Sequence, residues 1–161
     1  MLSAQEKPVN SHPPDKDSPT CEYDFTQQVG YLLRRAYQRH TEIFLQNSAD
    51  PQLTSTQFVT LCALCDHGPS SQAELIKATA IDQGTIRGLI ERLGKRGLIE
   101  VRAAEDDKRK VIVHITGQGR ELHQRMVSAA LRITELTSRN LNQAERLALS
   151  FLLEKMLKGD E

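Results

Sequence analysis

The stretch 71–116 constrains the fold of this sequence most, because segments of different periodicity follow one another there. Apolar residues recur at three- and four-residue steps in 71–79 and again in 82–96, which predicts two short helices joined by a tight turn. Gly97 follows two cations at the end of the second segment, and glycine is the residue that most readily ends a helix in the left-handed conformation. This order predicts a helix-turn-helix.

Two runs rich in Ile and Val, 98–102 and 111–115, follow these helices and predict the strands of a hairpin. The loop between them, 103–110, carries both acidic and basic residues. Two short helices and a hairpin with a charged tip are typical of a winged helix-turn-helix, whose second helix enters the major groove of DNA. The expected fold class is mainly α with a small β-hairpin wing, a winged helix-turn-helix plus long terminal dimerisation helices.

Both short helices carry start signals of their own. Ser71 and Glu74 have the capping-box spacing, in which the hydroxyl and the carboxylate each accept a backbone N–H. Asp82 is expected to cap the second helix, with Ile81 packing on Ile86 across its first turn. These local signals fix where the two helices begin.

Two motifs in this stretch resemble those of the MarR family of bacterial transcriptional regulators. Residues 107–116, Asp-Lys-Arg-Lys-Val-Ile-Val-His-Ile-Thr, match the family's wing pattern of Asp-x-Arg, a strand, and then an apolar residue and Thr. Residues 93–99, Leu-Gly-Lys-Arg-Gly-Leu-Ile, match the end of its recognition helix. The likeness extends over about residues 24–158. It implies a repressor that pairs its terminal helices into a two-fold dimer and is released from DNA by a small ligand, often an aromatic acid.

The candidate DNA contacts lie on the second helix and on the wing. Gln can pair with adenine, Arg with guanine, and Thr offers a hydroxyl and a methyl group. Arg109 is expected to enter the minor groove, with Asp107 orienting it through a charge-assisted pair. Gly84 and Gly88 each cost roughly 1 kcal/mol inside a helix, which close approach to DNA or to a neighbouring helix would explain. The candidate DNA-binding residues are Gln83, Gly84, Thr85, Arg87, Arg92, Lys108, Arg109 and Lys110.

Composition limits the partners of the chain. With 21 basic and 21 acidic residues the formal net charge is +0, so any affinity for DNA must come from an uneven distribution of charge. The three cysteines are an odd number, no apolar run is long enough to span a membrane, and no secretory signal precedes the domain. These features predict a reduced, cytoplasmic protein with no membrane partner, no cofactor and no metal.

Apolar stripes of helical period flank the central stretch and predict four further helices. Their expected spans are 24–46, 54–66, 117–140 and 143–158. Capping-box spacings start three of them, at Asp24 with Gln27, Thr54 with Gln57 and Asn142 with Glu145, and Thr116 caps the fourth. In the last helix, the residues expected to face inward are Leu147, Phe151, Leu152 and Met156.

The terminal helices exceed what a winged helix needs for its own core. Residues 22–47 and 116–158 are therefore expected to pair with a second copy of the chain, outside the winged helix 54–115. A homodimer carries two recognition helices and is expected to bind an inverted repeat in double-stranded DNA. Residues 1–21, rich in proline and polar side chains, are expected to form a flexible arm before the single domain 22–161.

The resemblance also implies a site for a small aromatic acid between the winged helix and the dimer helices. Such a ligand needs a cation and a flat wall with a polar edge. The candidate ligand-binding residues are Arg35, Tyr37, His40 and His67. Residues 28–40 resemble, more weakly, a subgroup that controls the breakdown of aromatic acids, nicotinate-type compounds among them.

Three alternatives accompany this interpretation. Cys62 and Cys65 have the spacing of a thiol pair, so a redox-sensing regulator is one alternative, although buried small hydrophobic residues explain them as well. An enzyme is disfavoured, because no glycine-rich phosphate loop and no His-Glu-x-x-His motif occurs. A winged helix used only for protein contact is the third alternative, and salt-insensitive binding to a protein would support it.

Overall fold

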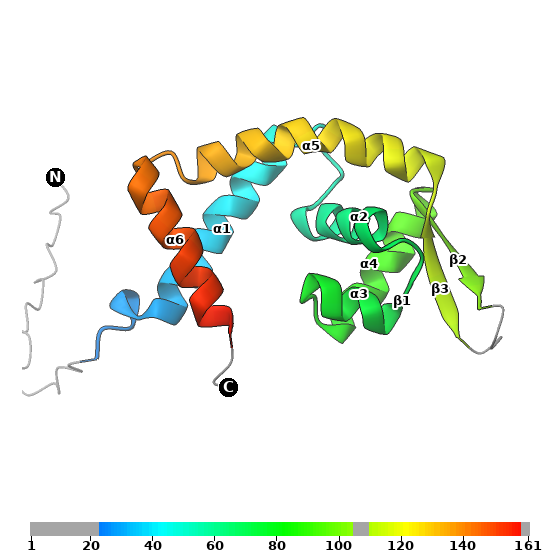
Figure 1. The fold of residues 1–161 in the computed structure, drawn as a ribbon, viewed down its shortest axis with the longest axis horizontal. Helices are drawn as coiled ribbons and strands as arrows, with labels where there is room; N and C mark the ends of the chain where they lie inside the picture. The colour runs from blue at the N-terminus through cyan, green and yellow to red at the C-terminus, as the bar shows by residue number, and fades with distance from the viewer. Residues whose placement is uncertain (1–22, 105–109, 159–161) are drawn as a thin grey trace, which may run out of the picture.

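The computed structural model describes residues 23–104 and 110–158 and has the expected mainly helical architecture with one small sheet (Figure 1). The elements, in chain order, are η1 (Phe25–Gln27), α1 (Val29–Asn47), α2 (Ser55–His67), β1 (Ser70–Ser71), α3 (Gln72–Thr79), α4 (Gln83–Lys95), β2 (Ile99–Ala103), β3 (Val111–Ile115), α5 (Gly117–Thr137) and α6 (Gln143–Leu157). The expected arm, 1–21, lies outside the described residues.

The helix α5 connects two groups of elements (Figure 1). Its first half lies beside the winged-helix unit, formed by α2, α3, α4 and the sheet. Its second half lies beside α1, and α6 turns back from its end. Any movement of α5 therefore affects both groups.

Local capping signals start the helices where the sequence predicts. The reciprocal capping box is formed at Thr54, Ser71 and Asn142. Asp82 caps α4 and Thr116 caps α5, each accepting a backbone N–H three residues ahead. Each box satisfies N–H groups that would otherwise lack a partner.

The sheet has three antiparallel strands in the order β1-β3-β2. The predicted hairpin is confirmed, with Ile99 opposite Ile115 and Ala103 opposite Val111. The short strand β1 adds Ser70 opposite Val113 and was not predicted. Two residues are too few to display an alternating pattern, so the sequence carried no signal for this strand.

One apolar core joins the winged-helix unit to α5. Its fully buried side chains come from α2, α3, α4, the loops before α2 and after α4, and α5. They are Leu53, Leu61, Leu64, Leu75, Ile86, Leu89, Leu93, Leu98, Leu122, Met126 and Ile133. The core thereby connects the recognition helix α4 to α5 through α3 and α2.

The first predicted helix differs from the structure. It does not run unbroken from residue 24, because Gln28 is extended at φ −77° and ψ 141° and separates η1 from α1. Asp24 accepts the Thr26 N–H and caps η1 instead of forming a box with Gln27. Capping spacing specifies a first turn but not the length of the helix that follows. At the other end of the chain, α5 stops at Thr137 rather than near residue 140.

The inward orientation expected for α6 is wrong within one subunit. Leu147 and Phe151 are 68% and 62% exposed, Leu152 and Met156 are also exposed, and α6 has no buried residue. On α1 the one buried side chain is Phe44. The apolar faces of these two helices thus remain uncovered by the described part of their own subunit. Within that part, no helix combines the length and apolar character needed to cross a bilayer.

Candidate nucleic-acid interface

The helix α4 buries one face and exposes the other. Ile86, Leu89 and Leu93 are buried in the core at helical spacing. The candidate DNA contacts on this helix all lie at exposed positions: Gln83, Gly84, Thr85, Arg87 and Arg92. An exposed polar face on a firmly packed helix is the arrangement that groove recognition needs.

The start of α4 is held by Asp82. Its carboxylate accepts the Thr85 N–H at 2.9 Å, and hydrogen bonds from Thr85 lower the pKa of Asp82. The preceding turn contains Ala80 in the left-handed conformation, with φ 54°. Because alanine rarely adopts this conformation, the left-handed residue of this turn could not be predicted from the sequence.

Gly84 and Gly88 are not required by a neighbouring helix. A Cβ on Gly84 would meet only Asp82 Oδ1 within 4 Å, at 3.3 Å. A Cβ on Gly88 would meet only the Arg92 guanidinium, nearest at 3.3 Å. Packing within the subunit therefore does not explain these two glycines, and their close approach to DNA stays a prediction.

A hollow of about 470 Å³ lies at the exposed start of α4. It is lined by Gln83, Gly84 and Arg87 together with Gln72, the first residue of α3. Three predicted DNA contacts therefore lie together, and sequence reasoning missed the fourth lining residue. The one available signal was the position of Gln72 directly after the cap of the first helix of the helix-turn-helix.

The wing is described in part. Its strands β2 and β3 are in place, Lys110 is exposed, and Arg102 pairs with Glu100 on the exposed face of β2. Asp107, Lys108 and Arg109 lie outside the described residues, so their predicted roles stay predictions.

A larger cavity of about 590 Å³ lies between α1, α2 and the turn before α4. The residues lining it are Tyr37, His40, Ser55, Thr56, Val59, Thr79, Ala80, Ile81, Asp82 and Thr85. Because the wall includes Asp82 and Thr85, a molecule bound there would touch the first turn of the recognition helix. Sequence reasoning missed most of this lining, since it comes from separate elements that share no local pattern.

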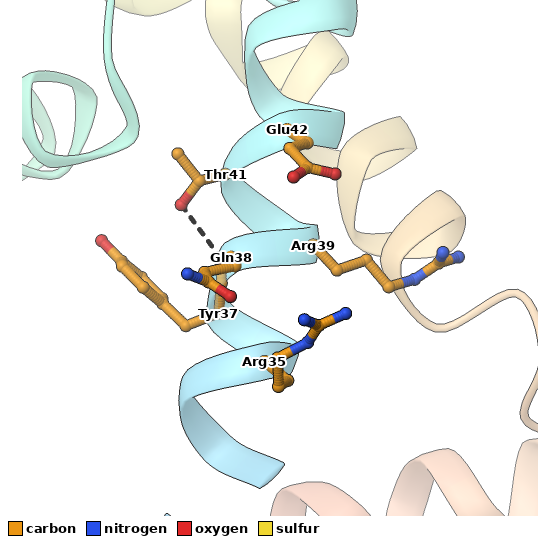
Figure 2. A pocket seen from close by; sticks show the side chains of 6 residues that line it. All are labelled: Arg35, Tyr37, Gln38, Arg39, Thr41 and Glu42. Carbon is orange, nitrogen blue, oxygen red and sulfur yellow. Dashed lines mark hydrogen bonds between the residues drawn. The ribbon is translucent and has the colours of Figure 1, made fainter. Parts of the chain in front are cut away.

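The four predicted ligand residues do not all meet in this cavity. Tyr37 and His40 line it, whereas Arg35 lines an adjacent hollow together with Tyr37. Figure 2 shows Tyr37 on one side of α1 and Arg35 with Arg39 on another. His67 lies in a separate hollow beside α3. No Lys or Arg is among the described residues that line the larger cavity.

His40 is positioned as a neutral hydrogen-bonding group. Burial lowers its pKa, so the uncharged ring is favoured at neutral pH. Its Nδ1 lies 3.1 Å from the Thr137 hydroxyl oxygen. That hydroxyl donates its own hydrogen to the Ile133 carbonyl at 2.8 Å. The Nδ1–H of His40 is therefore the donor, which leaves Nε2 as an acceptor.

The cysteines of α2 are half-buried beside the core. Burial raises the pKa of the Cys62 thiol to about 11, and the charge of Asp66 adds to the effect. Burial also raises the pKa of Cys65. Because the thiolate is the reactive form, this environment gives no support to the thiol-sensing alternative.

Comparison with known proteins places these features in context. The model of the MarR family matches residues 53–111. The HTH-type transcriptional repressor NicR of Pseudomonas putida is 60% identical over 139 residues, covering 86% of this chain and 88% of that protein.

Solved structures of regulators share this fold over more than four fifths of the chain. BpsR of Bordetella bronchiseptica, whose DNA binding is regulated by 6-hydroxynicotinic acid, is 53% identical with a TM-score of 0.80, over 86% of this chain and 99% of that one. The PcaV regulator of Streptomyces coelicolor, in complex with its natural ligand, is 25% identical with a TM-score of 0.76, over 83% and 94% of the two chains.

Proposed function

Because this chain belongs to the MarR family of transcriptional regulators, we propose that it is a dimeric repressor released from an inverted-repeat operator by a small aromatic acid. The observation that carries the proposal is the orientation of α4, whose apolar face is locked in the core while its polar face is exposed. The 60% identity to a transcriptional repressor supports the sign of regulation.

Recognition of bases falls to the start of α4. Gln83 and Arg87 line one hollow and offer bidentate partners for adenine and guanine, and Thr85 lies exposed beside them. Gly84 lets the backbone approach the groove. Arg92, nearer the end of α4, is assigned to the phosphate backbone.

The wing supplies contacts outside the major groove. Arg109 is assigned to the minor groove and Asp107 to its orientation, with Lys108 and Lys110 beside the phosphates. Since the wing carries both signs of charge, its affinity for DNA depends on where its cations stand rather than on an excess of them.

The uncovered apolar faces of α1 and α6 support pairing with a second copy. Leu147 and Phe151 are more than half exposed, and apolar patches of this kind are usually covered by another surface. Two-fold pairing would set two α4 helices against successive major grooves, about 34 Å apart. In sedimentation equilibrium the wild type should be a dimer, and Phe151→Glu should shift it toward monomer. Ala78→Glu, an equal charge on exposed α3, should not.

The aromatic ring of the effector is assigned to the cavity between α1, α2 and the turn before α4, whose described lining supplies no Lys or Arg for the carboxylate. A ligand there would contact Tyr37 and His40 on one side and Thr85 on the other. It would act by preferring an angle of α4 that does not fit the operator. The likeness to BpsR favours a hydroxylated nicotinate-type acid, because 6-hydroxynicotinic acid regulates the DNA binding of BpsR.

One experiment tests the DNA and effector parts together. Selection by the purified protein from a random duplex library should enrich an inverted repeat. Fluorescence anisotropy with that duplex should then show binding that weakens with salt. Adding 6-hydroxynicotinic acid should release the DNA, whereas benzoic acid should do so less well. Failure to enrich any sequence would refute operator recognition, and enrichment without release would refute the effector class.

A further inference from the structure

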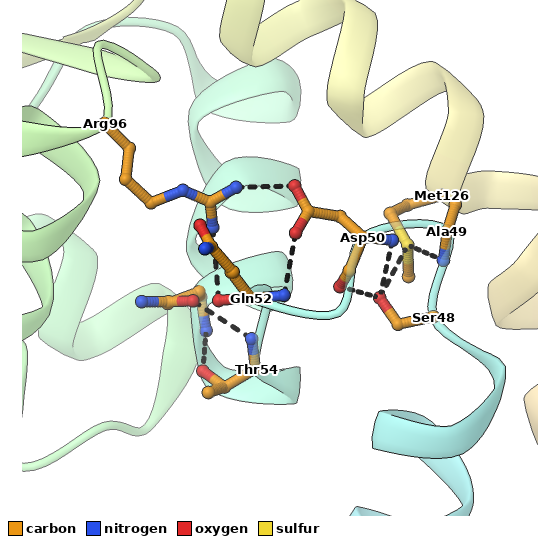
Figure 3. A network of polar contacts seen from close by, with 8 residues as sticks. Ser48, Ala49, Asp50, Gln52, Thr54, Arg96 and Met126 are labelled. Carbon is orange, nitrogen blue, oxygen red and sulfur yellow. Dashed lines mark hydrogen bonds and ion pairs between the residues drawn. The ribbon is translucent and has the colours of Figure 1, made fainter.

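Arg96, the residue that follows α4, is turned into the loop between α1 and α2 (Figure 3). Its Nη2 lies 2.5 Å from Asp50 Oδ2, and its Nη1 donates to the Gln52 carbonyl at 3.1 Å. The side chains of Arg96 and Asp50 are only 24% and 19% exposed. A single guanidinium therefore holds the loop at two points, which its fork of donors allows.

The same loop is attached to α5 on its other side (Figure 3). The Ala49 N–H donates to Met126 Sδ at 3.2 Å, and the Ser48 hydroxyl lies 3.3 Å from the same sulfur. Met126 is fully buried on α5. Within the loop, Asp50 Oδ1 accepts the Gln52 N–H at 2.8 Å, so both oxygens of the carboxylate are engaged. A continuous set of contacts thus leads from α5 through the loop to the end of α4.

This route matters because α4 packs mainly on α3 and β2, while α5 packs mainly on α1 and α2. The neighbouring cation is arranged differently. Lys95 pairs with Glu91 in solvent, with side chains 72% and 65% exposed. An exposed pair contributes little to stability, whereas a shielded one fixes geometry and is costly to break.

We propose that Arg96 and Asp50 form a clasp that sets the angle of the recognition helix relative to the dimer helices. Arg96 is then a positioning residue for operator binding and makes no DNA contact of its own. The inference rests on the proposed function and deepens it, because the clasp would carry a movement of α1 or α5 to α4. Physical coupling of this kind requires contiguous contacts with two arrangements.

Asp50→Asn tests the clasp, because it weakens the pair without removing any cation. If only long-range charge mattered, loss of a negative charge would leave DNA binding equal or tighter. If the clasp positions α4, the variant should bind the operator about tenfold more weakly, within the usual range for coupled sites. Anisotropy with the selected operator measures this, at a temperature where circular dichroism shows the variant folded.

Glu91→Gln is the matched control, since it makes the same change of charge in the exposed pair of α4. Its operator affinity should stay within about twofold of the wild type. The clasp is overturned if Asp50→Asn binds the operator as tightly as Glu91→Gln does. Should Asp50→Asn be unfolded, Arg96→Lys replaces it. A single ammonium cannot supply the guanidinium fork, so affinity should again fall, and wild-type affinity would overturn the proposal.

The proposed function and the clasp are refuted by different outcomes. If neither the wild type nor Glu91→Gln binds any duplex, the proposed function fails and the clasp fails with it. If the wild type and both variants bind the operator equally, the clasp alone fails.

Discussion

The stability of α4 and the proposed approach of its backbone to DNA make opposite demands on Gly84. Glycine is unfavourable inside a helix, and the space around Gly84 accepts a methyl group with a small shift of Asp82 Oδ1. Gly84→Ala should therefore stabilise the folded protein by up to about 1 kcal/mol in urea unfolding. It should also weaken operator binding, because the methyl group would stand between the backbone and the groove.

Gly94→Ala provides the control for this pair of effects. Gly94 lies in the same helix with nothing within 4 Å of an added Cβ, and away from the hollow at its start. It should gain similar stability and keep its operator affinity. Equal affinity in both variants would show that the backbone at Gly84 does not approach DNA.

Cys62 carries a second prediction at this scale. Since its pKa is about 11, its thiolate is scarce at neutral pH. The third cysteine of the sequence, Cys21, is first replaced by serine, so that only the two cysteines of α2 can react. In this Cys21→Ser variant, an aromatic disulfide reagent should react slowly with the native protein and quickly with the urea-unfolded chain. Operator affinity should be the same before and after treatment with peroxide. Rapid labelling of the native protein, with loss of DNA binding, would restore the thiol-sensing alternative.

The individual elements were predictable to the extent that their signals are local. The caps at Ser71, Asp82 and Asn142 depend on side chains a few residues apart, so the sequence displays them. The buried face of α4 was predictable from the three- and four-residue spacing of its apolar residues, which is also a local signal. By contrast, β1 exists only because β3 lies beside it, and the break at Gln28 depends on a single extended residue.

The start of α5 provides a prediction at the scale of elements. A Cβ on Gly119 would lie 2.1 Å from the Leu98 carbonyl oxygen and 2.8 Å from Ile115 Cγ1. Backbone would have to move, so Gly119→Ala should destabilise the protein by about 1–3 kcal/mol, as overpacking does. Urea unfolding measures the loss. Gly117→Ala, two residues earlier in open space, should leave stability nearly unchanged. Equal stability of the two variants would contradict the close packing of α5 on the turn after α4.

At the scale of the whole molecule, α5 joins α1 to the winged-helix unit. The predicted ligand residues were the hardest to place, because the cavity draws on α1, α2 and the turn before α4 at once. No short-range pattern in the sequence shows that Tyr37 and Thr85 line the same cavity. Asp82 and Thr85 belong both to the lining of the cavity and to the start of α4, so a ligand in the cavity would contact the start of the recognition helix, as the proposed release from the operator requires.

His40 tests this link. Its Nδ1–H is used on Thr137, so the acceptor Nε2 favours an effector that offers an O–H or N–H donor. His40→Phe keeps an aromatic ring beside Phe44 but removes both nitrogens. Without ligand, its operator affinity should match the wild type. The 6-hydroxynicotinic acid needed for half release should rise about tenfold, the value of one well-placed hydrogen bond.

The control is His67→Phe, because His67 lies in a separate hollow beside α3. Its response to the acid should equal that of the wild type. Nicotinic acid lacks the ring hydroxyl, so it should release the wild type less well than 6-hydroxynicotinic acid does. The difference in response between the wild type and His40→Phe should also be smaller with nicotinic acid. Since burial lowers the pKa of His40, the response should persist at a pH where an exposed histidine is already half protonated. If His40→Phe and His67→Phe respond equally to the acid, the assignment of the effector to this cavity is refuted. The proposed DNA contacts of α4 would be unaffected by that result.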